Sequence, residues 1–276
     1  MNKDKLSISD KAFDKSLSYG ENLRRIREAG FTHLHFAHAF MRREPLSEEE
    51  CEEIEQGLEA HGIKVLDGHG CHPLGINTWS PAEEDREEAI LLLRHRLDLT
   101  KRFGGDSLVY HVPWQLQITD QIVAFFIEGL KRVEEYARER GLGIALENHY
   151  TLEGDRRALE AAFSTFDSRY IGFTFDPGHA LISGNTEWLL QNCAERLMIL
   201  HLNDNDTEMD LHWCPYEEYG SADWPQIEDF VRRSPYQKPI QLEVQWRPDK
   251  HVNHMDFLRE AKAAGDRFRE ECNPVP

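Results

Sequence analysis

Short apolar runs alternate with longer amphipathic segments along the whole chain, and this alternation restricts the fold more than any other feature of the sequence. The runs lie at 5–8, 31–36, 63–67, 107–112, 142–146, 170–175, 197–202 and 239–244. Helical patterns follow them at 20–29, 47–61, 82–103, 119–140, 155–166, 186–195, 223–234 and 253–270. Apolar strands that alternate with helices are typical of a parallel sheet covered by helices.

Eight strand–helix units favour closure of this sheet into a barrel. The chain has 276 residues, and a (β/α)8 TIM barrel needs about 250. No linker or low-complexity segment interrupts the pattern, so we expect a single α/β domain over 1–276. An open doubly wound sheet is the alternative fold.

Glycines mark the ends of the first three helical patterns. Gly30, Gly62 and Gly104 stand where a left-handed residue is needed to end a helix. Thr119 is the expected N-cap of the fourth helical pattern, 119–140.

Composition and charge restrict the expected location of the protein and the classes of partner that it can bind. No stretch of about 18 apolar residues occurs and the N-terminal segment has no apolar signal core, so we expect a cytoplasmic protein without a membrane span. The net charge of −18 disfavours attraction to nucleic acid. Five cysteines without a CxxC pair fit reduced thiols better than disulfides or a zinc finger.

Four residues with metal-binding side chains stand at the ends of the last four predicted strands. They are Glu147, Asp176, His201 and Glu243, in the segments GIALEN, IGFTFDPGH, LMILHLND and PIQLEV. The gaps of 29, 25 and 42 residues each accommodate one strand–helix–strand step. A carboxylate at the end of a buried strand costs several kcal/mol unless it has a partner, so a shared divalent cation is the simplest explanation.

The other strand ends supply further polar and aromatic side chains, and in a barrel these ends build the active site. In chain order they are His69, His72, His111, Trp114, Asn148, His149, His179, Asn203, Asp204, Asp210, His212 and Trp246. Taken singly, each has an ordinary structural explanation: a histidine can be a core residue, FDPGH a turn, and Asn203 or Asp204 a loop cap. Only the joint pattern indicates a site.

The chain resembles the xylose-isomerase-like TIM barrel superfamily over its full length. The matching segments are LENH, FDPGHA, LHLND, the D-L-H step from Asp210 to His212, GSADW and LEV. This superfamily contains sugar-phosphate isomerases and epimerases, inosose dehydratases and nucleases of the AP endonuclease type. The resemblance implies that the four strand-end residues hold one divalent metal ion and that His179 lines the substrate site.

Three carboxylates and one imidazole form a hard, mostly oxygen ligand set. Such a set suits Mn, Mg or Co, with Zn or Fe as alternatives. A metal held there would stabilise an enediolate formed from a keto-sugar. Glu147 and Glu243 are the expected catalytic residues, one removing a proton and the other returning it. The candidate substrate-binding residues are His72, His111, His179, His212, Trp114 and Trp246.

The sequence therefore favours a metal-dependent isomerase or epimerase of a sugar, keto-sugar or polyol ketone. Loss of a β-hydroxyl from the same enediolate would give the alternative, an inosose-type dehydratase. Thr207 stands where ketose 3-epimerases usually have an arginine, which disfavours a free-ketose 3-epimerase. Gly220 alone matches the G-x-G pair that usually precedes D-W, so we expect the shape of this loop, and with it the substrate, to differ from those of better-known members. The expected partner is a small carbohydrate, and a homo-oligomer stays open.

Phosphoester hydrolysis is the main competing function. In the AP endonuclease type, the positions that resemble His69, His111, His179, Asp210 and His212 bind additional zinc ions, and all five residue types are present. Against this, the charge of −18 offers no evident DNA-binding face. A barrel that has lost its chemistry is a third alternative, disfavoured because all four expected ligands remain.

Overall fold

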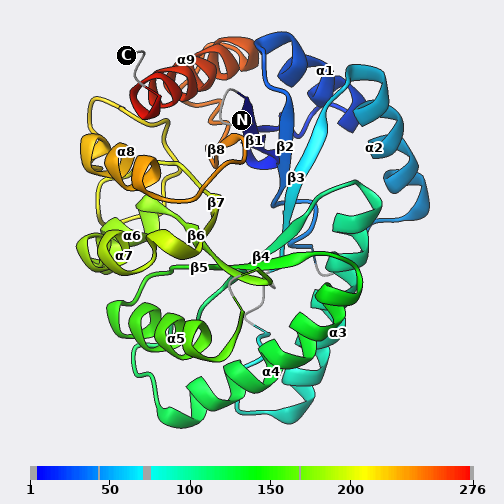
Figure 1. Cartoon of the computed structure of the whole chain (residues 1–276). Coiled ribbons are helices and arrows are strands. Elements are labelled where there is room, and N and C mark those ends of the chain that lie inside the picture. The colour runs from blue at the N-terminus through cyan, green and yellow to red at the C-terminus, as the bar shows by residue number, and fades with distance from the viewer. Residues whose placement is uncertain (1–4, 43, 71–75, 168, 274–276) are drawn as a thin grey trace.

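Eight parallel strands form a barrel with helices on its outside (Figure 1). A computed structural model describes residues 5–42, 44–70, 76–167 and 169–273. The strands are β1 (Leu6–Ser9), β2 (His33–Phe36), β3 (Lys64–His69), β4 (Ser107–His111), β5 (Gly143–Glu147), β6 (Ile171–Phe175), β7 (Leu197–Leu200) and β8 (Ile240–Leu242). They lie in the order β7, β6, β5, β4, β3, β2, β1, β8. The predicted (β/α)8 barrel is confirmed.

Hydrogen bonds just beyond β7 join the two end strands of this order. The amide of Leu202 donates to the carbonyl of Gln241 at 3.1 Å, and the amide of Glu243 donates to the carbonyl of Leu202 at 3.0 Å. These bonds close the barrel and rule out the open doubly wound sheet. Because Leu202 follows His201, they also place His201 and Glu243 at the same height in the barrel.

The helices surround this barrel in sequence order. They are α1 (Tyr19–Ala29), α2 (Glu48–His61), α3 (Glu83–Arg102), α4 (Asp120–Glu139), α5 (Leu152–Thr165), α6 (Pro177–Ser183), α7 (Thr186–Asn192), α8 (Trp224–Arg233) and α9 (His254–Cys272), with 3-10 turns at Asp10–Ala12 and Ala194–Arg196. Each predicted helical segment contains a helix. One short helix, α6, was not predicted: FDPGH starts a helix rather than a turn, because Asp176 caps it and Pro177 occupies its first turn.

Local signals at the helix ends act as predicted. Gly30, Gly62 and Gly104 have φ values of 104°, 60° and 87°, in the left-handed region that favours glycine. Thr119 accepts a hydrogen bond from the amide of Ile122 and so caps α4. β3 is longer than predicted and ends at His69 rather than at residue 67.

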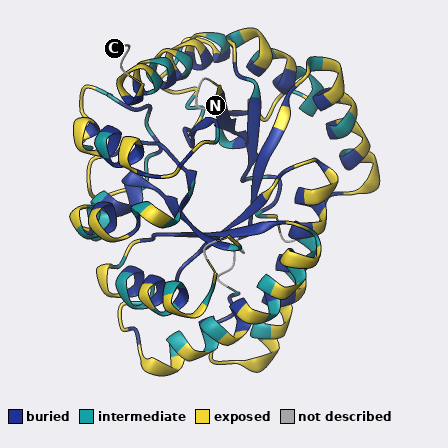
Figure 2. Cartoon of the chain, in the orientation of Figure 1, coloured by how far each residue is buried: buried dark blue, intermediate teal, exposed yellow. Residues whose placement is uncertain are grey.

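Two apolar layers hold the strands in place. The larger layer lies between the strands and the helices and includes the fully buried rings of Phe36, Phe126, Phe173, Phe230 and Phe268. The smaller is a separate cluster of Leu66, Val109, Ala145 and Ile199. Figure 2 shows the strands buried and the outward faces of the helices exposed.

Among the described helices, none is long and apolar enough to cross a membrane. The described cysteines are Cys51, Cys193, Cys214 and Cys272, which are buried and form no disulfide with one another. Cys71 lies outside the described residues.

Candidate active site

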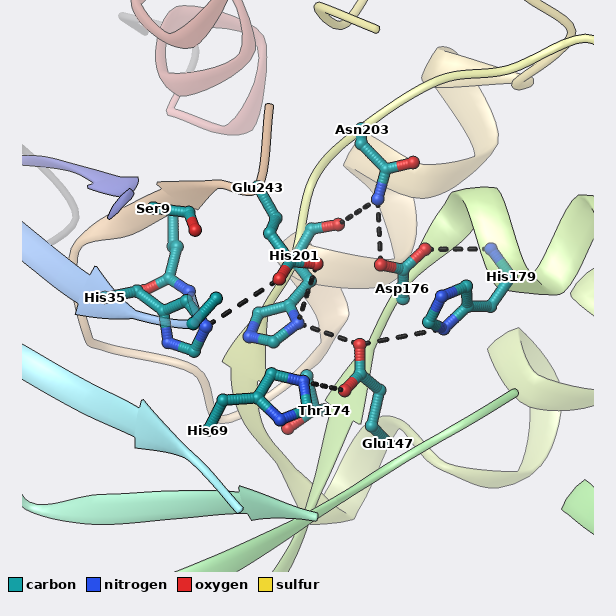
Figure 3. Close-up of polar contacts among 12 residues, drawn as sticks. Ser9, His35, His69, Glu147, Thr174, Asp176, His179, His201, Asn203 and Glu243 are labelled. Atoms are coloured by element: carbon teal, nitrogen blue, oxygen red, sulfur yellow. Dashed lines mark hydrogen bonds and ion pairs between the residues drawn. The ribbon is translucent and has the colours of Figure 1, made fainter. Parts of the chain in front are cut away.

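The four strand-end residues converge at the C-terminal end of the barrel (Figure 3). Glu147 is the last residue of β5, Asp176 follows β6, His201 follows β7, and Glu243 follows β8. One ligand atom from each lies within 4.8 Å of those from the other three. All four side chains are buried. The structure thus brings together the residues predicted to hold a metal ion.

His201 lies between the two glutamates. Its Nδ1 is 2.8 Å from Glu147 Oε1 and 3.2 Å from Glu243 Oε2. Burial alone would lower the pKa of His201, but Glu243 and Glu147 outweigh burial and raise the pKa well above its usual value. Burial would raise the pKa of each glutamate, and His201 contributes most to holding both pKa values well below the usual range. The glutamates therefore favour a cation between them.

Asp176 is held in place by three neighbours. Its Oδ1 accepts the amide of His179 at 2.8 Å, and its Oδ2 accepts Asn203 Nδ2 at 2.8 Å. Its own amide donates to Asn148 Oδ1 at 3.0 Å. Burial raises the pKa of Asp176 to about 6; His179 opposes this shift and Glu147 adds to it. Three converging carboxylates and one imidazole nitrogen fit a divalent metal ion, because such an ion would offset their mutual repulsion.

Two further histidines contact the second oxygen of Glu147. His69 Nε2, at the end of β3, is 3.2 Å from Glu147 Oε2, and His111 Nε2, at the end of β4, is 3.1 Å from the same oxygen. These three residues form a second group that could hold a metal ion. Burial lowers the pKa of both histidines, that of His69 to about 3. Both rings are therefore neutral at pH 7, as a histidine ligand must be.

A third group of charged residues lies beside Glu243. Asp210 Oδ2 is 3.0 Å from His212 Nε2 and 3.6 Å from His179 Nε2. Lys11 Nζ is 2.7 Å from His212 Nε2 and 3.2 Å from Glu243 Oε1. Burial would lower the pKa of Lys11, but Glu243 and Asp210 outweigh it and raise the pKa. Lys11 was not predicted as a site residue, although it follows the end of β1 by two residues.

Two further residues that were not predicted form a pair inside the barrel. His35 lies on β2 and Asp67 on β3, and both are fully buried. His35 Nδ1 is 3.1 Å from Asp67 Oδ2, which is 3.9 Å from His201 Nε2. Asp67 therefore faces the ring nitrogen of His201 that points away from the glutamates. At 3.9 Å Asp67 makes no hydrogen bond to His201 Nε2 and acts on this ring through its negative charge.

A cavity of about 210 Å³ lies beside this centre. It is lined by Lys11, Met41, His69, His111, Trp114, His149, Tyr150, His179, Asp210 and Glu243. Trp114 stacks on His149, with ring centroids 4.5 Å apart and an interplanar angle of 23°. The hydroxyl of Tyr150 donates to Asp210 Oδ2 at 3.0 Å. The cavity thus combines an aromatic wall with charged and hydrogen-bonding groups.

Three of the predicted substrate-binding residues line this cavity: His111, His179 and Trp114. His212 is buried beside Lys11 and lines a neighbouring cavity of about 290 Å³. His72 lies outside the described residues.

Trp246 is not placed against the cavity, in contrast to its predicted role. Its amide donates to the carbonyl of Lys11 at 3.2 Å. Its ring packs on His254 and Phe257 instead, with centroids 5.1 and 5.5 Å away. The two residues between Glu243 and Trp246 turn the ring toward α9.

Asp204 fixes the loop that contains GSADW. Its Oδ1 accepts the amides of Ser221 and Ala222 at 2.8 and 3.0 Å, and its Oδ2 accepts Trp224 Nε1 at 3.0 Å. A Cβ atom on Gly220 would lie 2.2 Å from Asp204 Oδ2, so this close approach requires glycine. This motif therefore shapes the loop beside the cavity.

Comparison with known proteins places the chain in a family. A family model described as "Xylose isomerase-like TIM barrel" matches residues 23–261. The chain belongs to this family. A curated relative, the uncharacterized protein y4fM of Sinorhizobium fredii, is 26% identical over 290 aligned residues, covering 94% of this chain and 90% of the relative.

Two solved structures illustrate the same fold. The IOLI protein, solved with a bound zinc atom, has a TM-score of 0.79 at 15% identity and covers 98% of this chain and 100% of its own. The 3-keto-D-glucoside 4-epimerase YcjR of E. coli has a TM-score of 0.73 at 18% identity and covers 95% of this chain and 99% of its own. At these identities the similarity demonstrates the fold of the xylose isomerase-like family alone.

Proposed function

We propose that this protein is a divalent-metal-dependent isomerase or epimerase that acts on a sugar, keto-sugar or polyol ketone through an enediolate. The position of the two glutamates is the main support. Glu147 and Glu243 approach His201 Nδ1 from separate strands, at 2.8 and 3.2 Å. Two carboxylates beside one potential metal position suit removal of a proton by one and its return by the other.

The cavity suits a small polar molecule. Its volume of about 210 Å³ lies below the roughly 300–1,000 Å³ of pockets for drug-sized ligands. The lining histidines offer hydrogen bonds to hydroxyl groups, and Trp114 offers an apolar face. A single sugar unit has both kinds of surface.

The residues at the strand ends fit a divalent metal ion, which would polarise a substrate carbonyl and lower the pKa of the neighbouring C–H group. The proton transfers fall to the side chains. One glutamate takes the C–H proton, the C–H electron pair becomes the C=C bond, and the carbonyl oxygen receives the negative charge. Return of the proton to the other face of the same carbon gives an epimer. Return to the former carbonyl carbon, with a proton exchanged between the oxygens, gives an isomer.

The comparisons support this class of reaction without fixing the substrate. YcjR is described as a 3-keto-D-glucoside 4-epimerase, and the IOLI structure contains zinc. If a β-hydroxyl leaves from the enediolate instead, the same centre acts as an inosose-type dehydratase. The product of an isomerase or epimerase has the same composition as the substrate, whereas the product of a dehydratase lacks one water molecule. Product analysis therefore separates these two activities.

Hydrolysis of a small phosphoester is the second candidate. The supporting observation is the additional group of His69, His111 and Glu147, whose ligand atoms lie within 4.8 Å of one another. Two metal ions that share a carboxylate are a common arrangement for attack on phosphorus. The charge of −18 disfavours DNA as the substrate.

Exchange of solvent deuterium into the substrate tests the primary proposal. The protein is stripped of metal, reloaded separately with Mn²⁺, Co²⁺, Mg²⁺ or Zn²⁺, and incubated in D₂O with panels of ketoses, polyol ketones and keto-glycosides. NMR should detect deuterium at a carbon next to the carbonyl for one class, only with metal present. This readout requires no assumption about which stereocentre changes.

Two variants make the experiment specific. Glu243→Gln should abolish exchange, whereas Glu228→Gln, at a buried glutamate of α8 that accepts the Tyr216 hydroxyl at 2.6 Å, should retain it. Absence of exchange with every panel, together with metal-dependent release of phosphate or alcohol from small phosphoesters, would replace the proposal with the second candidate.

A further inference from the structure

Lys11 is the sole lysine or arginine among the described residues that line the cavity, and its ammonium lies among groups that would suit a metal ion. Its Nζ contacts His212 Nε2 at 2.7 Å and Glu243 Oε1 at 3.2 Å. Asp210 Oδ2 lies 3.0 Å from the same His212 nitrogen. The Lys11 side chain is only 14% exposed, so its ammonium group has little room to move.

The hydrogen bonds of His212 define how it meets Lys11. His212 Nδ1 donates to the carbonyl oxygen of Glu243 at 2.8 Å. This bond holds the ring so that Nε2 faces the Lys11 ammonium at 2.7 Å and Asp210 Oδ2 at 3.0 Å.

The same nitrogen is one that a metal ion at this position would need. Asp210 Oδ2 lies 3.0 Å from His212 Nε2 and 3.6 Å from His179 Nε2. A metal ion and the Lys11 ammonium would compete for His212 Nε2 and for the negative charge of Asp210.

We propose that Lys11 is a built-in cation which occupies the position of a further metal ion beside Glu243 and donates a hydrogen bond to the substrate oxygen that becomes negative. An ammonium has three N–H donors, of which the contact to His212 uses one, while Glu243 Oε1 is an ion-pair partner at 3.2 Å. A remaining donor can reach a ligand, because Lys11 lines the cavity. The role in the reaction rests on the proposed function, whereas the role as a substitute for metal does not.

A fixed ammonium and a third metal ion differ in what they do for a substrate. The ammonium stabilises an oxyanion by a charged hydrogen bond and leaves no bound water to act as a nucleophile. This difference favours proton-transfer chemistry on a carbonyl compound over hydrolysis. Lys11 is thus a catalytic residue that also restricts the type of reaction.

Metal stoichiometry tests the first part without any substrate. Wild type, Lys11→Met, Lys11→Arg and the double variant Lys11→Met with His212→Ala are saturated with Zn²⁺ or Co²⁺, desalted and analysed by elemental mass spectrometry. Lys11→Met should bind one more ion per chain than wild type, and the double variant should lose that ion again. Lys11→Arg should keep the wild-type number. Lys15→Met, at an exposed lysine nearby, controls for the loss of one positive charge.

Equal ion counts in wild type and Lys11→Met, or occupation of the His179, Asp210 and His212 group in wild type, would overturn the substitution of Lys11 for a metal ion.

Deuterium exchange tests the second part, the hydrogen bond from Lys11 to the substrate oxygen. Lys11→Met should exchange about 10²-fold more slowly, the loss typical of one oxyanion donor, and Lys11→Arg should recover part of the rate. Unchanged exchange in Lys11→Met would refute the oxyanion role. Absence of exchange in wild type would refute the proposed function, while the ion count would still decide the placement of Lys11.

Discussion

The barrel interior has two parts that differ in chemistry, although the same strands build both. The upper part lies at the C-terminal ends of the strands, and the lower part lies nearer their N-terminal ends. Val109 and His111 lie two residues apart on one face of β4, and Ala145 and Glu147 do so on β5. The lower residues belong to the apolar cluster of Leu66, Val109, Ala145 and Ile199. The upper residues belong to the groups that could hold metal ions. One step of about 7 Å along a strand separates the two environments.

This difference separates stability from chemistry. Burial of the lower cluster stabilises the fold by about 25 cal/mol for each Å² of apolar surface. The upper part has the opposite effect, because buried carboxylates cost free energy unless a cation or protons offset their charge. We therefore expect substitutions in the upper part to change function with little loss of stability, and substitutions in the lower part to do the reverse.

Glu147→Gln should have the largest effect on activity. It removes an expected proton acceptor and a metal ligand, so deuterium exchange should fall by at least about 10³-fold, equivalent to roughly 4 kcal/mol. The metal-free variant should unfold slightly below the metal-free wild type, because it loses the ion pair of Glu147 with His201 and, in part compensation, the repulsion between Glu147 and Asp176. Thermal unfolding in the presence of a chelator measures this. A large loss of stability would contradict the separation of the two parts.

Ile199→Ala tests the lower part. The side chain is fully buried, and its truncation should lower the free energy of unfolding by about 2–4 kcal/mol. Metal content and the rate of deuterium exchange in the surviving folded protein should match those of wild type. Urea unfolding with metal analysis checks both. If metal affinity fell together with stability, the apolar cluster would have a role in positioning the ligands as well.

Asp176→Asn should give a pH-dependent gain in stability of the metal-free protein. The pKa of Asp176 is raised from 3.8 to about 6, so its contribution to stability is complete below pH 4 and is lost as the pH rises through 6. Asparagine cannot ionise and retains an acceptor for the amide of His179. A shift of about two pKa units corresponds to at most roughly 3 kcal/mol above pH 7. Unfolding measured from pH 4 to 8 should show the two proteins diverge between about pH 4 and pH 6 and keep a constant difference above about pH 7. Parallel curves would contradict the assignment.

The fold and the four convergent ligands were predictable because they depend on periodicity. Apolar runs of strand length locate the strands, and the C-terminal ends of parallel strands meet at one end of a barrel. Glu147, Asp176, His201 and Glu243 therefore had to come near one another once the barrel closed. The sequence could not give their separations, since these depend on the hydrogen bonds that close β7 onto β8.

The residues that were missed lack a comparable signal. His35 and Asp67 lie inside strands, and a shift in register between Leu34 and His35 changes which neighbours face each other across β2 and β3. Lys11 belongs to a short 3-10 turn, and an isolated lysine near a strand end is usually solvated. Trp246 does not line the cavity in the structure, because its distance along the chain does not reveal the direction in which the loop after β8 turns.

Asp67→Asn should weaken metal binding without abolishing it. Loss of the charge facing His201 Nε2 should raise the dissociation constant for Zn²⁺ or Co²⁺ by about 10- to 100-fold, as for other partners of histidine ligands. Competition with a chromogenic chelator measures this directly, with Glu228→Gln as a control for altering a buried carboxylate. An unchanged dissociation constant would mean that Asp67 supports the packing of His35 alone.

Trp114→Ala and Trp246→Ala form a matched pair with the smallest expected effects. Trp114 lines the cavity and stacks on His149, so its loss should raise KM by about tenfold with a smaller change in kcat, the pattern of lost ground-state binding. Trp246 packs on Phe257 and should affect thermal stability alone. Steady-state kinetics on whichever substrate supports deuterium exchange compares the two variants. A higher KM in Trp246→Ala would show that the loop after β8 moves toward the cavity when substrate binds, because the ring as placed lies against α9 and cannot contact a ligand there.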